Sequence, residues 1–511
     1  MEGRILSGER VLTQGELAAR VGRAASGFAS LGIGDNAAVA VVLRNDFAFF
    51  EAAMGAGAVG AYAVPVNWHF TADEAGYVLR DCDARCVVIH ADLLPALAPA
   101  IPEGVATFVV PTPPEIVAAY GIRGELARVP PGRTDWNEWV DSHPVRAEPP
   151  RPPRSNILYT SGTTGRPKGV RREPATPEMQ QCMARMVSTI MDIRPGTNMR
   201  TVITGPVYHS APNFYALSAV RDGGTVILQP RFNAIELLEM IERHRITHLH
   251  MVPTMFVRLL QLPEDVKRRY DLSSLKFVAH AAAPCPAEVK RRMIEWWGPV
   301  INEYYGATET GGCVFHTAEE ALRKPGTVGR PYEGCIVKIL DPQGRELPPN
   351  TVGEVFMRIV GFPEFTYHKL DDKRREIERA GLITAGDVGY LDADGYLFLC
   401  DRIRDMVISG GVNIYPAEIE AALVTMPGVK DCAVFGIPDE EFGEKVAAYV
   451  ELQDGATMDE SDVRSFLRER VAAFKVPKLI KFATDLPRED SGKIFKRKLR
   501  APYWEKAGRQ I

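Results

Sequence analysis

The stretch Tyr159-Thr-Ser-Gly-Thr-Thr-Gly-Arg-Pro-Lys-Gly169 directly follows residues 156–160, which we predict to form a buried strand. Its glycines let backbone amides turn inward, its hydroxyl side chains add donors, and Lys168 adds a positive charge. A loop of this composition suits a polyphosphate better than it suits a flexible linker. It is not a Walker A loop, because the spacing from Gly162 would require glycine where Pro167 stands. The candidate phosphate-binding residues are Thr160, Ser161, Gly162, Thr163, Thr164, Gly165 and Lys168.

Helix and strand signals alternate on the N-terminal side of this loop. Thr13 with Glu16, and Thr71 with Glu74, are capping boxes that predict helix starts. We predict strands at 38–43, 63–66 and 86–89 and a further helix at 46–60. This alternation predicts a parallel sheet covered by helices.

The alternation continues after the loop to about residue 400, and the units then become shorter. Predicted strands lie at 201–204, 225–228, 248–252 and 277–280, and further ones at 432–435, 446–452 and 478–482. The predicted fold class is α/β. We expect a large N-terminal α/β domain with helix-covered sheets, residues 1–403, and a small mobile C-terminal α+β domain, residues 404–511.

The composition excludes several classes of protein. With 46% hydrophobic and 25% charged residues, the chain of 511 residues has the makeup of a globular protein. A net charge of −4 gives no reason to expect a nucleic-acid partner. The eight cysteines are scattered, which favours reduced thiols. Charges in the first twenty residues leave no room for a signal peptide, and glycines interrupt the uncharged run 52–72, so we expect a cytoplasmic protein without a transmembrane segment.

Two weaker motifs have more ordinary interpretations. The glycines of Gly55-Ala-Gly-Ala-Val-Gly60 match a dinucleotide fingerprint by letters, but they fall inside a predicted helix, which favours close helix packing. A nicotinamide-dependent oxidoreductase is the alternative that they leave open. His244, His248 and His250 lie on both sides of a predicted helix end near Arg245 and need not share a face, so we favour structural roles over a metal site.

With the phosphate loop, further segments together carry a resemblance to a known family. These segments stand in the same order as in the family that they resemble. This family is the adenylate-forming superfamily, which includes acyl-CoA synthetases, peptide-synthetase adenylation domains and luciferases. The resemblance covers essentially the whole chain. The segments are Pro206-Val-Tyr-His209, Glu303-Tyr-Tyr-Gly-Ala-Thr-Glu309, Thr384-Ala-Gly-Asp387, Asp401-Arg-Ile-Arg-Asp405, Ser409-Gly-Gly-Val-Asn-Ile-Tyr-Pro416 and Ser491-Gly-Lys493.

The resemblance implies an ATP site within the large domain. Tyr305 would stack on adenine, and Glu303 would accept a hydrogen bond from the adenine amino group. Thr308 would contact the α-phosphate, and Glu309 would hold Mg²⁺ as a hard oxygen ligand. The resemblance further implies that Asp387 accepts from the ribose hydroxyls with Arg402 as its partner.

For the chemistry itself, the resemblance implies a lysine that moves with the small domain. Lys493 would reach the α-phosphate and the carboxylate during adenylation, and Arg404 would be the hinge between the domains. His209 would lie between the carboxylate site and the thiol tunnel. Many family members carry Glu where this chain has Val412, so a carboxylate pairing with His209 is not expected here. The implied catalytic residues are Lys493, His209, Thr308 and Glu309, and the implied coenzyme A residues are Ser409, Gly410 and Gly411.

The stretches that wall the acyl pocket in the family contain mostly small side chains here. We expect a wide apolar slot without a basic anchor for a second carboxylate. The expected substrate is therefore a hydrophobic monocarboxylate, either a medium to long acyl chain, as in fatty-acid metabolism, or a bulky ring-bearing acid. The implied pocket residues are Asn213, Phe214, Ala281, Ala282, Ala283, Gly311 and Gly312.

The predicted activity is that of an ATP-dependent acid–CoA ligase, with ATP, Mg²⁺, coenzyme A and a small carboxylic acid as its cofactors and partners. The chain ends 18 residues after Lys493, which favours free coenzyme A over an appended carrier domain. An acyl-AMP ligase that loads a separate carrier protein, and a pseudoenzyme that only senses ligand, are the alternatives, although the retained Glu309, Asp387, Arg402 and Lys493 argue against the latter. The oligomeric state is left open, a homodimer included.

Overall fold

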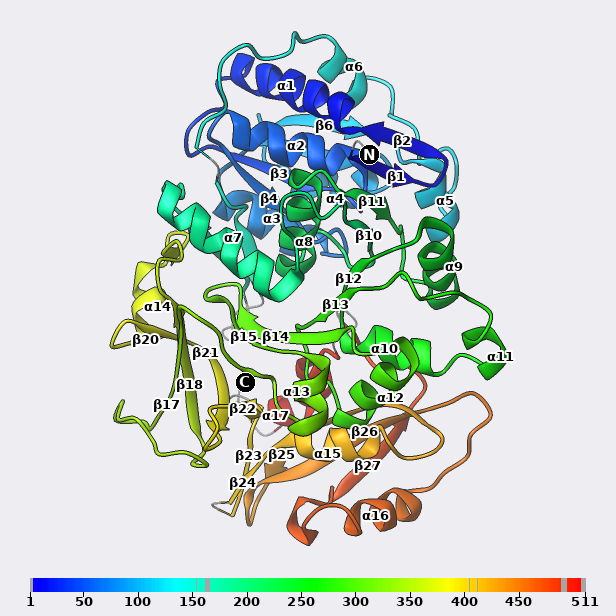
Figure 1. The fold of residues 1–511 in the computed structure, drawn as a ribbon, viewed down its shortest axis with the longest axis vertical. Helices are drawn as coiled ribbons and strands as arrows, with labels where there is room; N and C mark the ends of the chain where they lie inside the picture. The colour runs from blue at the N-terminus through cyan, green and yellow to red at the C-terminus, as the bar shows by residue number, and fades with distance from the viewer. Residues whose placement is uncertain are drawn as a thin grey trace.

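The computed structural model describes residues 3–152, 154–160, 166–403, 405–410, 412–488 and 494–506. The mixed α/β architecture is confirmed, and these residues form five sheets. The N-terminal elements (blue in Figure 1) and the C-terminal strands β25 (Val429–Asp439), β26 (Gly443–Leu452) and β27 (Leu479–Ala483; orange to red) lie at opposite ends of the molecule.

The first sheet is parallel and has strand order β4-β3-β5-β6-β7. Side chains alternate across it: Val39 and Val41 pack with α1 and α2, whereas Ala40 and Val42 pack with α3. Both predicted capping boxes are confirmed at the starts of α1 and α3. The elements are α1 (Gln14–Ser30), β3 (Ala38–Val42), α2 (Phe47–Ala58), β4 (Tyr62–Pro65), α3 (Ala72–Asp81), β5 (Ala84–His90), α4 (Leu94–Leu97), β6 (Ala106–Val110), α5 (Pro114–Tyr120), β7 (Thr134–Asp135) and α6 (Trp136–Asp141).

The second sheet has nine strands in the order β16-β15-β14-β13-β12-β10-β11-β1-β2. Helices α7 and α8 cover one face, while α9, α10 and α12 cover the other. The elements are β1 (Arg4–Ser7), β2 (Arg10–Thr13), α7 (Pro177–Met191), β10 (Arg200–Ile203), α8 (Ser210–Arg221), β11 (Thr225–Leu228), α9 (Ala234–His244), β12 (His248–Met251), α10 (Pro253–Leu260), α11 (Glu264–Lys267), β13 (Phe277–His280), α12 (Ala287–Trp297), β14 (Ile301–Ala307), β15 (Gly311–His316), α13 (Ala318–Arg323) and β16 (Arg330–Pro331).

Residues 335–402 differ from the expected α/β alternation. Most of them form an antiparallel sheet, in which the connections from β17 to β18 and from β21 to β22 contain tight turns at Asp341–Gly344 and Asp392–Gly395 and no helix. The elements are β17 (Cys335–Leu340), β18 (Gly353–Ile359), α14 (Asp371–Glu376), β20 (Glu378–Arg379), β21 (Leu382–Leu391) and β22 (Leu397–Arg402).

A three-stranded antiparallel sheet carries the predicted phosphate loop. It has the order β19-β9-β8, with β8 (Leu158–Thr160), β9 (Lys168–Arg172) and β19 (Phe365–Tyr367). Residues 161–165, between β8 and β9, lie outside the described residues. Lys168 begins β9 and pairs with Thr160 across the hairpin, so it occupies a strand position rather than a loop position.

The elements after residue 405 build their own sheet and core. Strands β24-β23-β26-β25, with β27 beside β26, pack under α15 and α16, and the core is formed by residues between 407 and 480. The predicted boundary at Arg404 stays a prediction, since this residue lies outside the described part of the chain. The other elements are β23 (Val407–Ser409), β24 (Val412–Ile414), α15 (Pro416–Leu423), α16 (Glu460–Arg468) and α17 (Lys496–Lys506).

The glycines at 55–60 and the histidines at 244–250 have structural roles. Gly55 and Gly57 lie inside α2, not in the turn between a strand and a helix that a dinucleotide site requires. His248 contacts Asp192 and His250 contacts Tyr304, and the described residues hold no cluster of His, Cys, Asp or Glu fit for a metal ion. All eight cysteines are free. Among the described helices, none is long and apolar enough to cross a membrane.

We predict opposite effects of substitutions at two glycines of α2. A Cβ on Gly55 would lie 3.0 Å from Ala24 Cβ in the facing helix α1, whereas a Cβ on Gly57 meets no atom within 4 Å. Gly55→Leu should therefore lower the free energy of unfolding by about 2 kcal/mol, and Gly57→Ala should raise it by up to about 1 kcal/mol. Urea unfolding of both variants measures this; equal effects would contradict the packing role of Gly55.

We also predict an acid-sensitive contribution to stability from His250. Burial lowers the pKa of His250 from 6.5 to about 4. The unfolded chain therefore takes up this proton at higher pH than the folded protein does, and the contribution of the neutral imidazole is lost as the pH falls from 6.5 towards 4. The loss between pH 8 and pH 5 amounts to about 2 kcal/mol. In His250→Gln, unfolding free energies at the two pH values should differ by correspondingly less; an unchanged difference would refute the assignment.

Candidate functional site

Several predicted site residues meet at the turn after β14, which carries Thr308 and Glu309. The Tyr367 hydroxyl donates to Glu309 Oε1 over 2.8 Å, and the Lys168 ammonium lies 5.0 Å from the centre of the Tyr367 ring. On the other side, Thr308 Oγ1 donates to Ser210 Oγ over 3.0 Å. The turn therefore joins the hairpin of the phosphate loop to the start of α8.

His209 lies at that start, as the N-cap of α8. Its ring centre lies 4.4 Å from that of Tyr208. Since Ser210 is the next residue and contacts Thr308, the structure brings His209 to the same edge of the nine-stranded sheet as the turn.

Sequence analysis missed Arg172, a buried arginine at the end of β9. Its Nη2 donates to the carbonyl oxygens of Thr308 and Glu309 over 2.8 and 2.7 Å, and its Nη1 donates to Pro363 O. Burial lowers the pKa of Arg172 to about 10, which leaves the guanidinium charged at neutral pH. An arginine in a hairpin gives no sequence signal of this role, because arginine side chains are mostly exposed.

A second group of predicted residues meets around Asp387. The Tyr305 hydroxyl donates to Asp387 Oδ2 over 2.6 Å, and Arg402 Nε lies 3.3 Å from Asp387 Oδ1. Asp387 and Arg402 are paired across β21 and β22. Burial and the Asp387 carboxylate raise the pKa of Tyr305 well above its ordinary value, so the phenol stays protonated.

Glu303 lies in a buried charged cluster beneath α12. Its carboxylate accepts from Lys290 Nζ and lies 2.9 Å from His316 Nε2. Burial alone would raise the pKa of Glu303, but the charge of Lys290 and the neighbouring imidazoles outweigh it and hold the pKa below its ordinary value. The carboxylate is thus kept ionised and able to accept further hydrogen bonds; its contact with adenine stays a prediction.

The glycines of the predicted acyl pocket do not face open space. A Cβ on Gly311 would lie 3.0 Å from Met186 Sδ, and one on Gly312 would lie 2.7 Å from Ile190 Cδ1. Both neighbours belong to α7, a helix that sequence analysis did not assign. The expected wide slot stays a prediction, and at these two positions side chains of α7 lie against the glycines.

The other predicted pocket residues lie close to the same edge. Asn213 is buried; its amide nitrogen donates to Val207 O over 2.7 Å, and its amide oxygen accepts from Asn156. Phe214 packs against the main core, Ala281 is buried and Ala282 is exposed with a φ of 74°. Ala283 is half-buried.

The predicted coenzyme A residues belong to the small domain. Ser409 ends β23, and Gly410, with a φ of 57°, donates its amide to Phe442 O. Val412 opens β24 and is 46% exposed, so an apolar side chain occupies the place of the carboxylate. The remaining predicted residues that lie outside the described part of the chain are Ser161, Gly162, Thr163, Thr164, Gly165, Arg404, Gly411 and Lys493.

The residues present fit a magnesium ion bound together with a nucleotide. Mg²⁺ prefers oxygen ligands and is commonly held by one or two carboxylates plus substrate phosphates. Glu309 supplies one carboxylate beside the phosphate-loop hairpin, and the hydrogen bond from Tyr367 leaves its second oxygen available.

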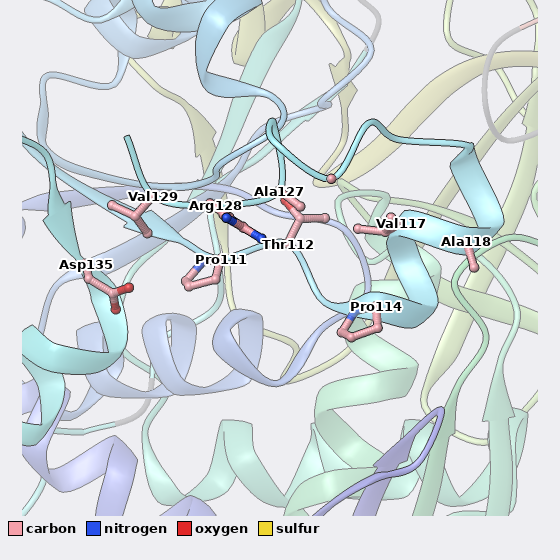
Figure 2. Close-up of a pocket in the computed structure, with 10 residues that line it drawn as sticks. Pro111, Thr112, Pro114, Val117, Ala118, Ala127, Arg128, Val129 and Asp135 are labelled. Atoms are coloured by element: carbon pink, nitrogen blue, oxygen red, sulfur yellow. The ribbon is translucent and has the colours of Figure 1, made fainter. Parts of the chain in front are cut away.

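One surface hollow lies elsewhere. It has a volume of about 580 Å³ and lies beside α5, with Pro114 and Val117 on one side and Arg128 and Asp135 on the other (Figure 2). None of the predicted site residues lines it.

Comparison with known families gives a match over both parts of the chain. The AMP-binding enzyme family matches residues 3–361, and the AMP-binding enzyme C-terminal domain matches residues 418–493. A feruloyl-CoA synthase from Amycolatopsis sp is 34% identical over 500 residues, which cover 97% of this chain and 95% of the relative. A fatty acid–[acyl-carrier-protein] ligase from Streptomyces coeruleorubidus is 31% identical, over 99% of this chain and 94% of the relative.

Solved structures are similar over nearly the full length. ATP-bound MatB from Rhodopseudomonas palustris is 27% identical with a TM-score of 0.81, covering 98% of this chain and 96% of that one. An amide bond synthetase from Marinactinospora thermotolerans is 25% identical with a TM-score of 0.83, covering 98% and 97%. With the phosphate-loop hairpin, the Thr308–Glu309 turn and the Tyr305–Asp387 pair in one fold, the chain belongs to the AMP-forming acyl-CoA ligases of the AMP-binding enzyme family.

Proposed function

We propose that this protein joins a hydrophobic, ring-bearing monocarboxylate to coenzyme A at the expense of ATP. The observation that carries the proposal is the assembly at one sheet edge of Lys168, Thr308 and Glu309 beside Tyr305 and Asp387. These residues supply a cation, a hydroxyl, a carboxylate that can bind a metal ion, and two side chains that can contact a nucleoside. Together they suit a nucleotide and its phosphates.

In the proposed reaction, a carboxylate oxygen attacks the α-phosphorus of ATP and pyrophosphate leaves. The sulfur of coenzyme A then forms a bond to the acyl carbon. The bond between that carbon and the attacking oxygen breaks, and AMP leaves with this oxygen. Such chemistry needs positioning and charge stabilisation more than covalent help from the protein. Lys168 and Thr308 would hold phosphate oxygens, Lys493 would stabilise the charge that develops during adenylation, and His209 would border the path of the thiol.

In the proposed metal site, the Glu309 carboxylate is the ligand that the protein supplies. Mg²⁺, when bound there with ATP, would neutralise phosphate charge. The protein's own part is to keep the Glu309 carboxylate in place, which the Tyr367 hydroxyl does.

The preference for a ring-bearing acid rests on the layer between α7, α8 and the sheet. Small and apolar side chains such as Ala279 and Ala281 line this layer, and polar pairs lie within it, among them His250 Nε2, which is 2.9 Å from the Tyr304 hydroxyl. The feruloyl-CoA synthase relative acts, by its name, on an aromatic acid with polar ring substituents. We therefore propose that the Tyr304 hydroxyl contacts a polar substituent of the ring.

A carrier protein is the second candidate acceptor. The relative from Streptomyces coeruleorubidus is named as a ligase for an acyl carrier protein, and it matches 99% of this chain. Comparing product formation with coenzyme A and with a phosphopantetheinylated carrier protein distinguishes the two acceptors.

A panel of acids tests the substrate proposal. Pyrophosphate release should be fastest with hydroxylated aryl acids, slower with unsubstituted aryl acids and slowest with acetate and dicarboxylates. Tyr304→Phe should reduce the ratio of kcat/KM for hydroxylated over unsubstituted acids by about tenfold, because a site built around a hydrogen bond discriminates through it. A parental protein that prefers acetate or dicarboxylates would refute the proposal.

Substitution of Lys493 tests the assignment of the adenylation step. Lys493→Ala should lower the rate of acyl-AMP formation by about 10²-fold, the scale of losing one preorganised charge. Chemically made acyl-AMP should still be converted to the thioester at close to the parental rate. Lys498→Ala is the matched control, since Lys498 is an exposed residue of α17. Parental adenylation by folded Lys493→Ala would remove the lysine from the mechanism.

A further inference from the structure

Arg172 and Tyr367 hold the Thr308–Glu309 turn from two directions. The Arg172 guanidinium donates to the main-chain carbonyls of both turn residues, and the Tyr367 hydroxyl donates to the Glu309 carboxylate. The main chain of the turn and the side chain of Glu309 are thus fixed separately. A carboxylate with one hydrogen-bonded oxygen has far fewer orientations than a free one.

Both residues belong to the sheet that carries the phosphate loop. Arg172 ends β9 and Tyr367 ends β19, and these strands pair with each other directly. Lys168 opens β9, and its ammonium lies 5.0 Å from the centre of the Tyr367 ring. The phosphate-loop hairpin and the turn are therefore connected through two side chains of one small sheet.

The residues around Arg172 restrict its side chain to one position. The guanidinium lies 4.7 Å from the centre of the Phe362 ring and 5.5 Å from that of Phe365, and the residue is 7% exposed. Its own carbonyl accepts from the Tyr62 hydroxyl over 2.8 Å, which links β9 to the N-terminal sheet. No described carboxylate forms an ion pair with it, so its hydrogen bonds go to main-chain carbonyls alone.

We propose that Arg172 and Tyr367 are positioning residues for the triphosphate and its metal ion. They hold Glu309 at a fixed place relative to the hairpin of Lys168, so that one bound nucleotide contacts both. Arginine suits this role because its planar fork can donate to several carbonyls at once, which an ammonium group cannot do in the same geometry. The inference rests on the proposed nucleotide site and adds two residues to it.

Nucleotide binding without turnover tests the inference independently of the acid. In isothermal titration, the dissociation constant for ATP with Mg²⁺ should rise about tenfold or more in Arg172→Met. It should rise less in Arg172→Lys, which keeps the charge but lacks the planar guanidinium with its several donors. Tyr367→Phe keeps the ring beside Lys168 and removes only the hydroxyl. It should weaken ATP binding about threefold or more in the presence of Mg²⁺, and less than twofold in EDTA.

Arg171→Met is the matched control. Arg171 is the neighbouring arginine of the same strand, where it lies over the Tyr62 ring and contacts Asn36 instead of the turn. Its substitution should leave ATP binding unchanged, and the melting temperature of Tyr367→Phe should stay within about 2 °C of the parent, in the usual range for a small change in stability.

Three results would overturn the inference. Folded Tyr367→Phe and Arg172→Lys that bind ATP with Mg²⁺ as tightly as the parent would show that the contacts do not position the site. Equal weakening of Tyr367→Phe with and without Mg²⁺ would show that the hydroxyl does not act through Glu309. A parental protein that does not bind ATP with Mg²⁺ would overturn the proposed function and this inference with it.

Discussion

A buried guanidinium that donates to three main-chain carbonyls is the contact on which the site's geometry depends. Arg172 connects β9 to the turn after β14 and to Pro363 before β19. These segments are separated by more than 130 residues along the chain, so local sequence cannot hold them together. Thr308 and Glu309 are half-buried and Pro363 is buried, and a carbonyl that is buried without a donor costs about 1–3 kcal/mol.

The proposed nucleoside site, around Asp387, depends on a different kind of contact. Tyr305 comes from β14, whereas Asp387 and Arg402 come from the antiparallel sheet. The hydrogen bond between Tyr305 and Asp387 therefore joins two sheets. The contacts of Arg172 and the contact between Tyr305 and Asp387 lie at one edge of the nine-stranded sheet and come from different parts of the fold. Ligand sites are expected at such an edge, beyond the carboxyl ends of parallel strands.

Sequence patterns predicted the parts of the site that recur as short motifs. The capping boxes at Thr13 and Thr71 and the parallel strands follow from local signals, and the assignment of Lys168 and Glu309 to one site follows from the resemblance of ordered segments. Arg172 was not predictable, because a basic residue in a hairpin is usually solvated. Its burial depends on Phe362 and Phe365, which lie almost 200 residues away.

The predicted acyl pocket shows the same limit. Glycines at 311 and 312 indicated open space, but whether a glycine faces space or a side chain depends on the element that packs on it. Helix α7 places Met186 and Ile190 there. The same helix, with α8, covers the layer that contains His250 and Tyr304, so packing between helix and sheet would set the shape of the proposed acyl pocket.

The central claim is that the acid's oxygen forms a bond to the α-phosphorus of ATP. An accepted acid labelled with ¹⁸O in its carboxylate, incubated with ATP and coenzyme A, tests it directly by mass spectrometry of the nucleotide product. We expect AMP that carries one ¹⁸O atom, with unlabelled pyrophosphate. Unlabelled AMP, or ADP with the label in inorganic phosphate, would contradict the account.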